Sequence, residues 1–339
     1  MYGGKEAGAR ASMAVMGAVL LLGGCSSAGG GGDGGDGTGP RIPRRPGSSG
    51  PFWVNPAGNA AEQVTAYAKA GRKDDAEQIR KIAERATGEW IGPENPEREA
   101  RGFTQAAERA DRAAVLVLYN IPHRDCGQFS RGGAADGDTY RTWIDGVARG
   151  IGDRPATVVL EPDAIPHLVD RCTPARLREE RYFLLKEAVT KLKSLQNTKV
   201  YLDAGNAGWG HPDQIFQPLE RAGVGLADGF AVNVSNFYST RDSVAYGKRL
   251  SAKVGGKHFV IDTSRNGNGP YTAGKADENW CNPPGRALGE SPTTKTADPL
   301  VDAYLWVKRP GESDGTCKGG PKAGDWWPEY ALGLARASG

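Results

Sequence analysis

The sequence predicts an α/β fold: a distorted, incomplete parallel β/α barrel of about seven strands, similar to a TIM barrel. Two observations lead to this prediction. Short apolar runs alternate with longer helical patterns along most of the 339 residues, and repeated β-then-α units build a parallel sheet. Most of the short runs are continuously apolar, which is typical of parallel strands covered by helices on both faces. Seven strand signals instead of eight indicate a barrel that does not close fully.

Strands and helices are expected in alternation from residue 60 onward. The expected strands are residues 89–91, 115–119, 157–161, 199–203, 229–234, 258–262 and 303–307. The expected helices are residues 60–86, 138–150, 174–195, 212–222, 239–254 and 325–336. The first helix is rich in Ala, Glu, Lys and Arg, which favour helices. The third opens with Thr173 and Pro174, a cap residue followed by a proline at the first helical position.

The N-terminus has the pattern of an export signal. Lys5 and Arg10 precede a short apolar run at 14–22, and small residues lead into Cys25. We therefore expect residues 1–24 to be a signal peptide. A cysteine directly after Leu-Gly-Gly resembles a bacterial lipobox, in which Cys25 would be lipidated and become the mature N-terminus. An ordinary signal peptide that contains a cysteine is the alternative.

The rest of the chain divides into a tether and one large domain. Residues 25–50 are mainly Gly, Ser, Asp and Pro, a composition that cannot form a packed core and predicts a flexible tether. Residues 51–339 have no second low-complexity break and read as one domain. The net charge of +3 is small for this length and gives no support for nucleic-acid binding. We expect a secreted monomer, with membrane contact only through the possible lipid anchor.

Cysteine parity supports this organisation. Cys25 is the odd one among five, which leaves Cys126, Cys172, Cys281 and Cys317 as an even set in an exported chain. Four cysteines allow three pairings, and their clustering in sequence favours Cys126–Cys172 and Cys281–Cys317. Zinc binding is the competing interpretation, but there is no CxxC spacing and there are only four histidines.

Acidic side chains follow the ends of most expected strands. They are Asp125, Asp163, Asp203, Asp262 and Asp314. Barrel enzymes place reacting groups at the carboxyl ends of strands, so we expect these carboxylates on one rim. A single aspartate there is commonly a cap or a loop acceptor, whereas several indicate acid/base catalysis or metal binding. Metal binding would favour closely spaced aspartates or added histidines, and neither is present.

Aromatic residues lie in or beside the same strand-end segments. They are Tyr119, Trp209, Trp280 and Trp306. Flat rings in a groove suit the apolar faces of sugar rings, while carboxylates and amides bind the hydroxyls. Core packing is the alternative for each ring: it is strong for Trp306, which is expected inside a strand, and weak for Trp209 and Trp280.

Six motifs carry a resemblance to a known family. They are residues 117–126 (VLYNIPHRDC), 158–163 (VVLEPD), 201–209 (YLDAGNAGW), 233–236 (NVSN), 280–285 (WCNPPG) and 306–315 (WVKRPGESDG). In this order they resemble glycoside hydrolase family 6, the inverting cellulases, and most closely its bacterial endoglucanases. The resemblance covers about residue 51 to the C-terminus. It implies no metal and no organic cofactor.

The resemblance assigns roles to four of these five acidic residues. Asp163 resembles the general acid, which must stay protonated near neutral pH. Asp125 resembles a helper that favours this protonation and can receive a proton through water. Asp314 is the candidate base, and an inverting mechanism implies carboxyl groups roughly 6.5–9.5 Å apart. Asp203 matches a fourth acidic site residue. Asp262 has no such match and is expected to be structural.

Further residues match substrate-handling positions. Ser130 resembles the residue that places the attacking water, and Tyr119 the tyrosine beneath the distorted sugar. The substrate-binding positions are Arg124, Asn206, Trp209, Asn236, Trp280, Lys308 and Glu312. Many members of the family have His at the position of Asn206, a difference that concerns the affinity of one subsite.

The resemblance leaves three functions to compare. The segment from Asp314 to Trp326 is short, so it can provide little chain for a roof, and an open active-site cleft is expected. This favours an endo-β-1,4-glucanase, which cuts cellulose and related β-glucans internally by inversion. A cellobiohydrolase is the alternative within the family. A non-catalytic glucan-binding surface protein is the alternative of another class.

Overall fold

A computed structural model describes residues 50–275 and 278–339. The expected signal peptide, Cys25 and the tether up to residue 49 lie outside the described residues. No helix in the described part of the chain is both long and apolar enough to cross a membrane.

The seven predicted strands form one parallel sheet in sequential order, which confirms the predicted fold class. The strands are β1 (Glu89–Ile91), β2 (Ala114–Leu118), β3 (Ala156–Leu160), β4 (Thr198–Asp203), β5 (Gly229–Val232), β6 (His258–Asp262) and β7 (Val301–Leu305). Each is parallel to its neighbour. The edge strands β1 and β7 approach each other just outside the ladder, since Gly88 N donates to Trp306 O at 2.8 Å. The sheet is therefore a curled, open barrel.

Both faces of the sheet are buried, and each face has its own core. Val115, Val117 and Val159 point to the concave side, where they meet buried residues of β4 to β7. Leu116 and Leu160, on the opposite face, pack against the surrounding helices. This double burial explains why the strand sequences are continuously apolar.

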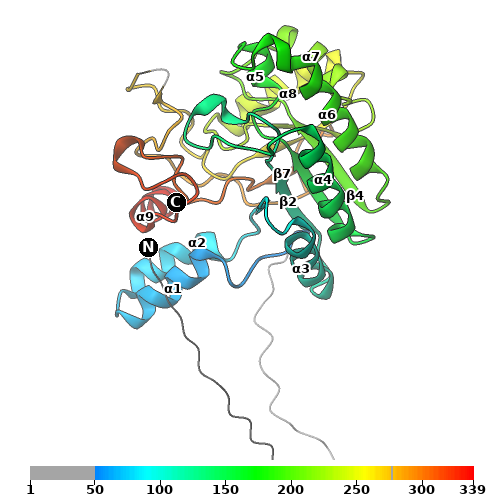
Figure 1. Ribbon diagram of the computed structural model, residues 1–339. Coiled ribbons are helices and arrows are strands. Elements are labelled where there is room, and N and C mark those ends of the chain that lie inside the picture. The colour runs from blue at the N-terminus through cyan, green and yellow to red at the C-terminus, as the bar shows by residue number, and fades with distance from the viewer. Residues whose placement is uncertain (1–49, 276–277) are drawn as a thin grey trace, which may run out of the picture. The chain divides into compact units, whose positions relative to one another are not determined.

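The helices surround this sheet. They are α1 (Asn59–Lys69), α2 (Lys73–Ala83), α3 (Pro96–Arg109), α4 (Gly137–Ile151), α5 (Pro166–Val169), α6 (Ala175–Lys193), α7 (Pro212–Arg221), α8 (Thr240–Lys253) and α9 (Pro328–Ala337). Figure 1 shows α4 and α6 beside the strands, while α1, α2 and α9 lie together elsewhere. The latter group shares a separate core, in which Ile79 and Ile82 of α2 and Leu334 of α9 are buried.

Several helix boundaries differ from the prediction. The single helix expected at 60–86 is two helices, because the chain turns at Gly71 with a φ of +76°, a conformation that glycine adopts without strain. Helix α3 was missed. Its buried face consists of Ala100, Phe103, Thr104 and Ala107, a weakly apolar stripe in a charged segment. The short α5 was also missed, and α6 begins after Pro174, which occupies the cap position.

Strand boundaries shift by one or two residues, most clearly at β7. This strand ends at Leu305, so Trp306 lies just past it and not inside it as predicted. Trp306 is nevertheless buried, and its indole N–H donates to Glu290 O at 2.9 Å. Its expected role in core packing is therefore confirmed.

Candidate active site

A cleft of about 1140 Å³ opens at the carboxyl ends of the strands. Every catalytic and substrate-binding residue predicted from the sequence lines it: Tyr119, Arg124, Asp125, Ser130, Asp163, Asp203, Asn206, Trp209, Asn236, Trp280, Lys308, Glu312 and Asp314. These residues come from segments that follow β2, β3, β4, β5 and β7 and from the loop between β6 and β7. The fold thus gathers them as the strand-end argument predicts.

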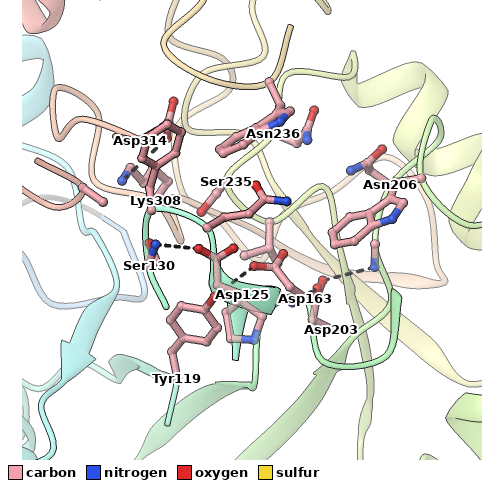
Figure 2. A pocket seen from close by; sticks show the side chains of 18 of the residues that line it. Tyr119, Asp125, Ser130, Asp163, Asp203, Asn206, Ser235, Asn236, Lys308 and Asp314 are labelled. Carbon is pink, nitrogen blue, oxygen red and sulfur yellow. Dashed lines mark hydrogen bonds and ion pairs between the residues drawn. The ribbon is translucent and has the colours of Figure 1, made fainter. Parts of the chain in front are cut away.

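Asp163 lies in the segment after β3, between two other polar groups. Its backbone N–H donates to Asp203 Oδ2 at 2.7 Å, and the Tyr119 hydroxyl donates to Asp163 Oδ2 at 3.2 Å. Figure 2 shows Asp125, Asp163 and Asp203 grouped above Tyr119. Burial raises the pKa of Asp163 well above the ordinary carboxyl range, and the charges of Asp203 and Asp125 raise it further. This carboxyl group can therefore stay protonated near neutral pH.

Asp203 ends β4 and is almost fully buried. Besides the Asp163 N–H, it accepts the Gly205 N–H at 3.3 Å. Burial also raises the pKa of Asp203, which these backbone hydrogen bonds partly offset. The charge of Asp203 raises the pKa of Asp163, so the proton affinities of these two carboxyl groups are linked.

Asp125 lies on the loop after β2, which bends back through backbone contacts. Ser130 N donates to Asp125 Oδ2 at 2.5 Å. Arg124 lies over the Tyr119 ring, with its Cζ 4.6 Å from the centroid, and its Nε donates to Ser130 O at 2.9 Å. Burial raises the pKa of Asp125. Arg124 therefore holds the loop in shape, and its predicted contact with substrate stays a prediction.

The predicted disulfide Cys126–Cys172 is present and ties this loop to the segment before α6. The second predicted disulfide, Cys281–Cys317, is also present. It joins the segment that carries Trp280 to the one that carries Asp314. Both bridges therefore connect loops at the rim of the cleft.

Several non-glycine residues of these segments have a left-handed backbone. The φ angles of Asp125, Cys126, Glu161, Asp163 and Ser235 lie between 48° and 69°. Such conformations are costly for most side chains and persist where surrounding contacts enforce them. Asp125 and Asp163 belong to the cluster of carboxylates in Figure 2, and Cys126 and Glu161 lie within two residues of them in the sequence. The backbone is therefore strained where the carboxylates converge.

Asp314 lies in a different electrostatic setting from the other aspartates. Arg265 Nη1 and the Asn282 N–H both donate to its Oδ2, at 2.9 and 3.0 Å. Lys308 Nζ lies 3.7 Å from Oδ1. In Figure 2, Lys308 and Asp314 lie together on the side of the pocket away from Asp203. Two cations and a backbone donor stabilise the charged carboxylate. Asp314 therefore lies among cations and a backbone donor, whereas burial and neighbouring carboxylates raise the pKa of Asp163.

The opposite wall carries Trp209 and Asn206. The Trp209 indole N–H donates to Asp170 Oδ2 at 3.1 Å, and its ring meets the edge of His167 with centroids 4.9 Å apart. Asn206 Oδ1 accepts the Gly208 N–H at 3.0 Å. These contacts fix the indole plane at the cleft wall, which is the arrangement a sugar-stacking ring requires.

Two predicted binding residues have partners elsewhere on the rim. Asn236 Oδ1 accepts the Phe237 N–H at 2.9 Å, which leaves its amide nitrogen at the cleft. Glu312 is buried and accepts from Arg309 Nη1 at 3.1 Å and from Asn59 Nδ2 at 3.4 Å. Both can bind sugar hydroxyl groups.

The sequence analysis missed a group of buried residues that support the site. Glu161 is fully buried, and its carboxylate accepts the Asn120 and Ile121 N–H groups at 2.9–3.1 Å. Arg181 of α6 donates to the Pro122 and His123 carbonyl oxygens at 3.1 and 3.0 Å. Burial raises the pKa of Glu161 to about 7. Together they fix the chain that leads to Asp125.

A signal for Glu161 did exist, because it stands two residues before Asp163 in the same motif. Arg265, the partner of Asp314, also follows a strand closely, but a lone arginine there carries no distinctive pattern. Arg181 sits within a charged helix and could not be singled out.

Asp262 has the structural role expected from the sequence. It is fully buried and accepts four backbone N–H groups, from Ser235, Ser264, Val307 and Lys308, at 2.9–3.3 Å. It therefore joins the ends of β5, β6 and β7 and places Lys308.

One group of described residues has the composition of a metal site. The ligand atoms of Cys126, His167 and Cys172 lie within 4.8 Å of one another. However, the two cysteines form a disulfide and have no thiolate to offer a metal.

An open parallel barrel with a strand-end cleft lined by carboxylates and aromatic rings defines a glycoside hydrolase class. The chain belongs to glycosyl hydrolases family 6, since the model of that family matches residues 48–338. The resemblance seen in the sequence is thereby confirmed.

Individual relatives agree with this assignment. Endoglucanase A from Cellulomonas fimi is 46% identical over 249 residues, and endoglucanase A from Thermobispora bispora is 39% identical over 291 residues. The matches cover 74% and 84% of this chain but only 53% and 62% of those two proteins. The solved endoglucanase Cel6 from Mycobacterium tuberculosis, in complex with a methyl-cellobiosyl-thio-cellobioside, is 44% identical with a TM-score of 0.79. That match covers 86% of this chain and 98% of the solved one.

Proposed function

We propose that this protein is an endo-β-1,4-glucanase that hydrolyses cellulose and related β-glucans with inversion. The observation that carries the proposal is the cleft itself, in which Asp163, with a raised pKa, lies near Asp125 and Asp203 and beside the proposed sugar-binding groups. The relatives named endoglucanase and the solved complex with a cellobioside derivative support the choice of substrate. Cellulose and cello-oligosaccharides are the proposed partners.

Asp163 is the proposed general acid, which donates its proton to the leaving glycosidic oxygen. A water attacks the anomeric carbon from the opposite face, and its proton must pass to a carboxylate. Tyr119 is the residue proposed to support the distorted sugar, and Ser130 the one proposed to position the water. The sugar-binding roles of Asn206, Trp209, Asn236, Trp280, Lys308, Glu312 and Arg124 complete the proposal.

Two carboxylates compete for the role of proton acceptor. Asp314, the candidate base, accepts a hydrogen bond from Arg265 and lies near Lys308, so its carboxylate already contacts two cations. Asp125 has a raised pKa and is held by the backbone of Ser130, the residue proposed to place the water. Asp125 can thus receive the proton through water, in agreement with its helper role.

Internal cutting is supported by the path of the segment after Asp314. Gly324 N donates to Ser313 O at 3.0 Å, and Ser313 N donates to Asp325 O at 2.9 Å. The segment therefore folds back onto its own start, and Ala323 and Gly324 line the edge of the cleft. A cellobiohydrolase, the alternative within the family, would need a roof at the cleft.

The test uses soluble carboxymethyl-cellulose. An endo-acting enzyme lowers the viscosity quickly while it creates few reducing ends, whereas an exo-acting enzyme releases reducing ends with little loss of viscosity. Asp163→Ala should abolish hydrolysis but retain binding of cello-oligosaccharides. A wild-type protein that binds glucan and never cuts it would support the non-catalytic alternative.

We further propose export and membrane anchoring through Cys25. The support is the N-terminal sequence, with its basic, apolar and small-residue regions before that cysteine. Cys25→Ser should release the enzyme from cells into the medium. Unchanged association with cells would contradict the anchor.

A further inference from the structure

Phe129 is a large apolar side chain whose exposure the proposed function does not explain. It is 46% exposed, although it lies on the short loop between Asp125 and Ser130 and lines the cleft. Exposed aromatic rings within a ligand cleft commonly have a binding role. The sequence analysis assigned no role to this residue.

The ring is held in place by two neighbours from other loops. Its centroid lies 6.2 Å from that of Trp280, with the two planes tilted by 55°. On another side it packs directly over Gly315, where an added Cβ would come within 2.4 Å of the ring. Gly315 is the residue after Asp314, and its φ is +154°. A side chain at position 315 would therefore displace the ring.

These contacts fix the ring on one side of Asp163. Ser130 and Asp314, the neighbours of Phe129 and Gly315 in sequence, lie on the opposite side of Asp163 from Asn206 in Figure 2. Asn206 forms a backbone bridge with Trp209. The cleft therefore carries aromatic rings on both sides of the acid: Trp209 on one side, Phe129 and Trp280 on the other.

We propose that Phe129 forms, with Trp280, an aromatic subsite that stacks on one glucosyl unit of the bound glucan. The tilt between the rings suits a sugar that rests on one ring and meets the other with its edge. Because the ring is already ordered by Gly315, binding loses little conformational freedom. This inference rests on the proposed function, since it names a further contact for the same substrate.

The experiment measures binding of cellohexaose by calorimetry in an Asp163→Asn background, which prevents hydrolysis. Phe129→Leu keeps an apolar side chain against Gly315 but removes the flat ring, and Phe129→Tyr keeps the ring. We expect Phe129→Leu to weaken binding roughly 3- to 10-fold, the scale of one aromatic contact. Phe129→Tyr should bind like the parent.

Phe183→Ala is the matched control, because Phe183 is also an exposed phenylalanine, at 57%, and it lies on α6 and not among the residues that line the cleft. It should leave binding unchanged. Unaltered affinity in Phe129→Leu, or equal losses in Phe129→Leu and Phe183→Ala, would overturn the subsite. The kcat of Phe129→Leu is measured separately in the enzyme that keeps Asp163. A loss of kcat there, with unchanged binding in the Asp163→Asn background, would also overturn the subsite, because the ring would then act only by packing. Failure of the parent to bind cellohexaose at all would instead refute the proposed function.

Discussion

Replacement of Asp203 by asparagine tests the electrostatic origin of the proposed acid. The amide oxygen can still accept the Asp163 N–H, which now bonds Asp203 Oδ2 at 2.7 Å. The amide NH₂ then faces the Gly205 N–H, whose present hydrogen bond is long at 3.3 Å, so the backbone at Asp163 should stay in place. The negative charge is lost. Since this charge is the largest charge contribution that raises the pKa of Asp163, that pKa should fall in the variant.

The sign and size of the effect follow from the role of the acid. Asp163 must be protonated to work, so activity is lost as the pH rises through its pKa. A like charge within about 4–6 Å shifts a pKa by roughly 1–3 units. Partial solvent access favours the lower end, so the alkaline limb of kcat/KM should move down by about one unit. At a pH on that limb, activity should fall by about tenfold.

The assay is the pH dependence of kcat/KM on a chromogenic cello-oligosaccharide. Asp302→Asn serves as the control, because it removes the same charge from an aspartate that likewise accepts a hydrogen bond, from the Tyr201 hydroxyl at 2.7 Å, but lies near the start of β7 and does not line the cleft. Its alkaline limb should match that of the wild type. An alkaline limb in Asp203→Asn that stays in place or moves up, in a protein with an unchanged circular dichroism spectrum, would refute the reasoning.

Three further outcomes are expected. Glu161→Gln places an amide NH₂ against the Asn120 or Ile121 N–H, so the loop before Asp125 should loosen. We expect kcat to fall about tenfold, as one unsatisfied buried group costs roughly 1–3 kcal/mol, with KM changed little; an equal rise in KM would contradict a positioning role. Arg265→Met removes the buried cation from Asp314. It should lower the free energy of unfolding by about 3–5 kcal/mol and reduce kcat. A variant as stable as the wild type in urea would contradict this stabilising role of Arg265. Cys281→Ser together with Cys317→Ser removes a disulfide between residues 36 apart. The lost loop-closure contribution is about 4 kcal/mol, so the midpoint of thermal unfolding should fall by roughly 6 °C. An unchanged midpoint would show that the disulfide adds no stability.

The sequence predicted the sheet well because each strand is marked by its own composition. Runs such as 114–118 are apolar at every position, and their burial on both faces makes this necessary. The rim could be predicted because the side chains that do chemistry follow directly after those runs. Asp163 and Asp203 therefore needed no three-dimensional information to be placed together.

Other features depend on contacts that no local pattern shows. Arg265 and Asp314 are 49 residues apart, and only the fold reveals that one neutralises the other. The aromatic contact of Phe129 depends on a glycine far along the chain. Helix α3 was missed because alanine and threonine fill most of its buried face, and the single helix expected at 60–86 was wrong because one glycine reverses the chain.

The positions of the two disulfides separate the assembly of the barrel from that of the rim. None of the strands in the described residues 50–275 and 278–339 contains a cysteine. By contrast, Cys126 directly follows Asp125, and Cys281 directly precedes Asn282, which binds Asp314. Protein made in a reducing cytosol should therefore reach a folded barrel with its catalytic loops untied. Oxidation after purification should then raise specific activity far more than it raises helix content. The yield of folded recombinant protein is therefore expected to depend on formation of the barrel, and its activity on formation of the disulfides.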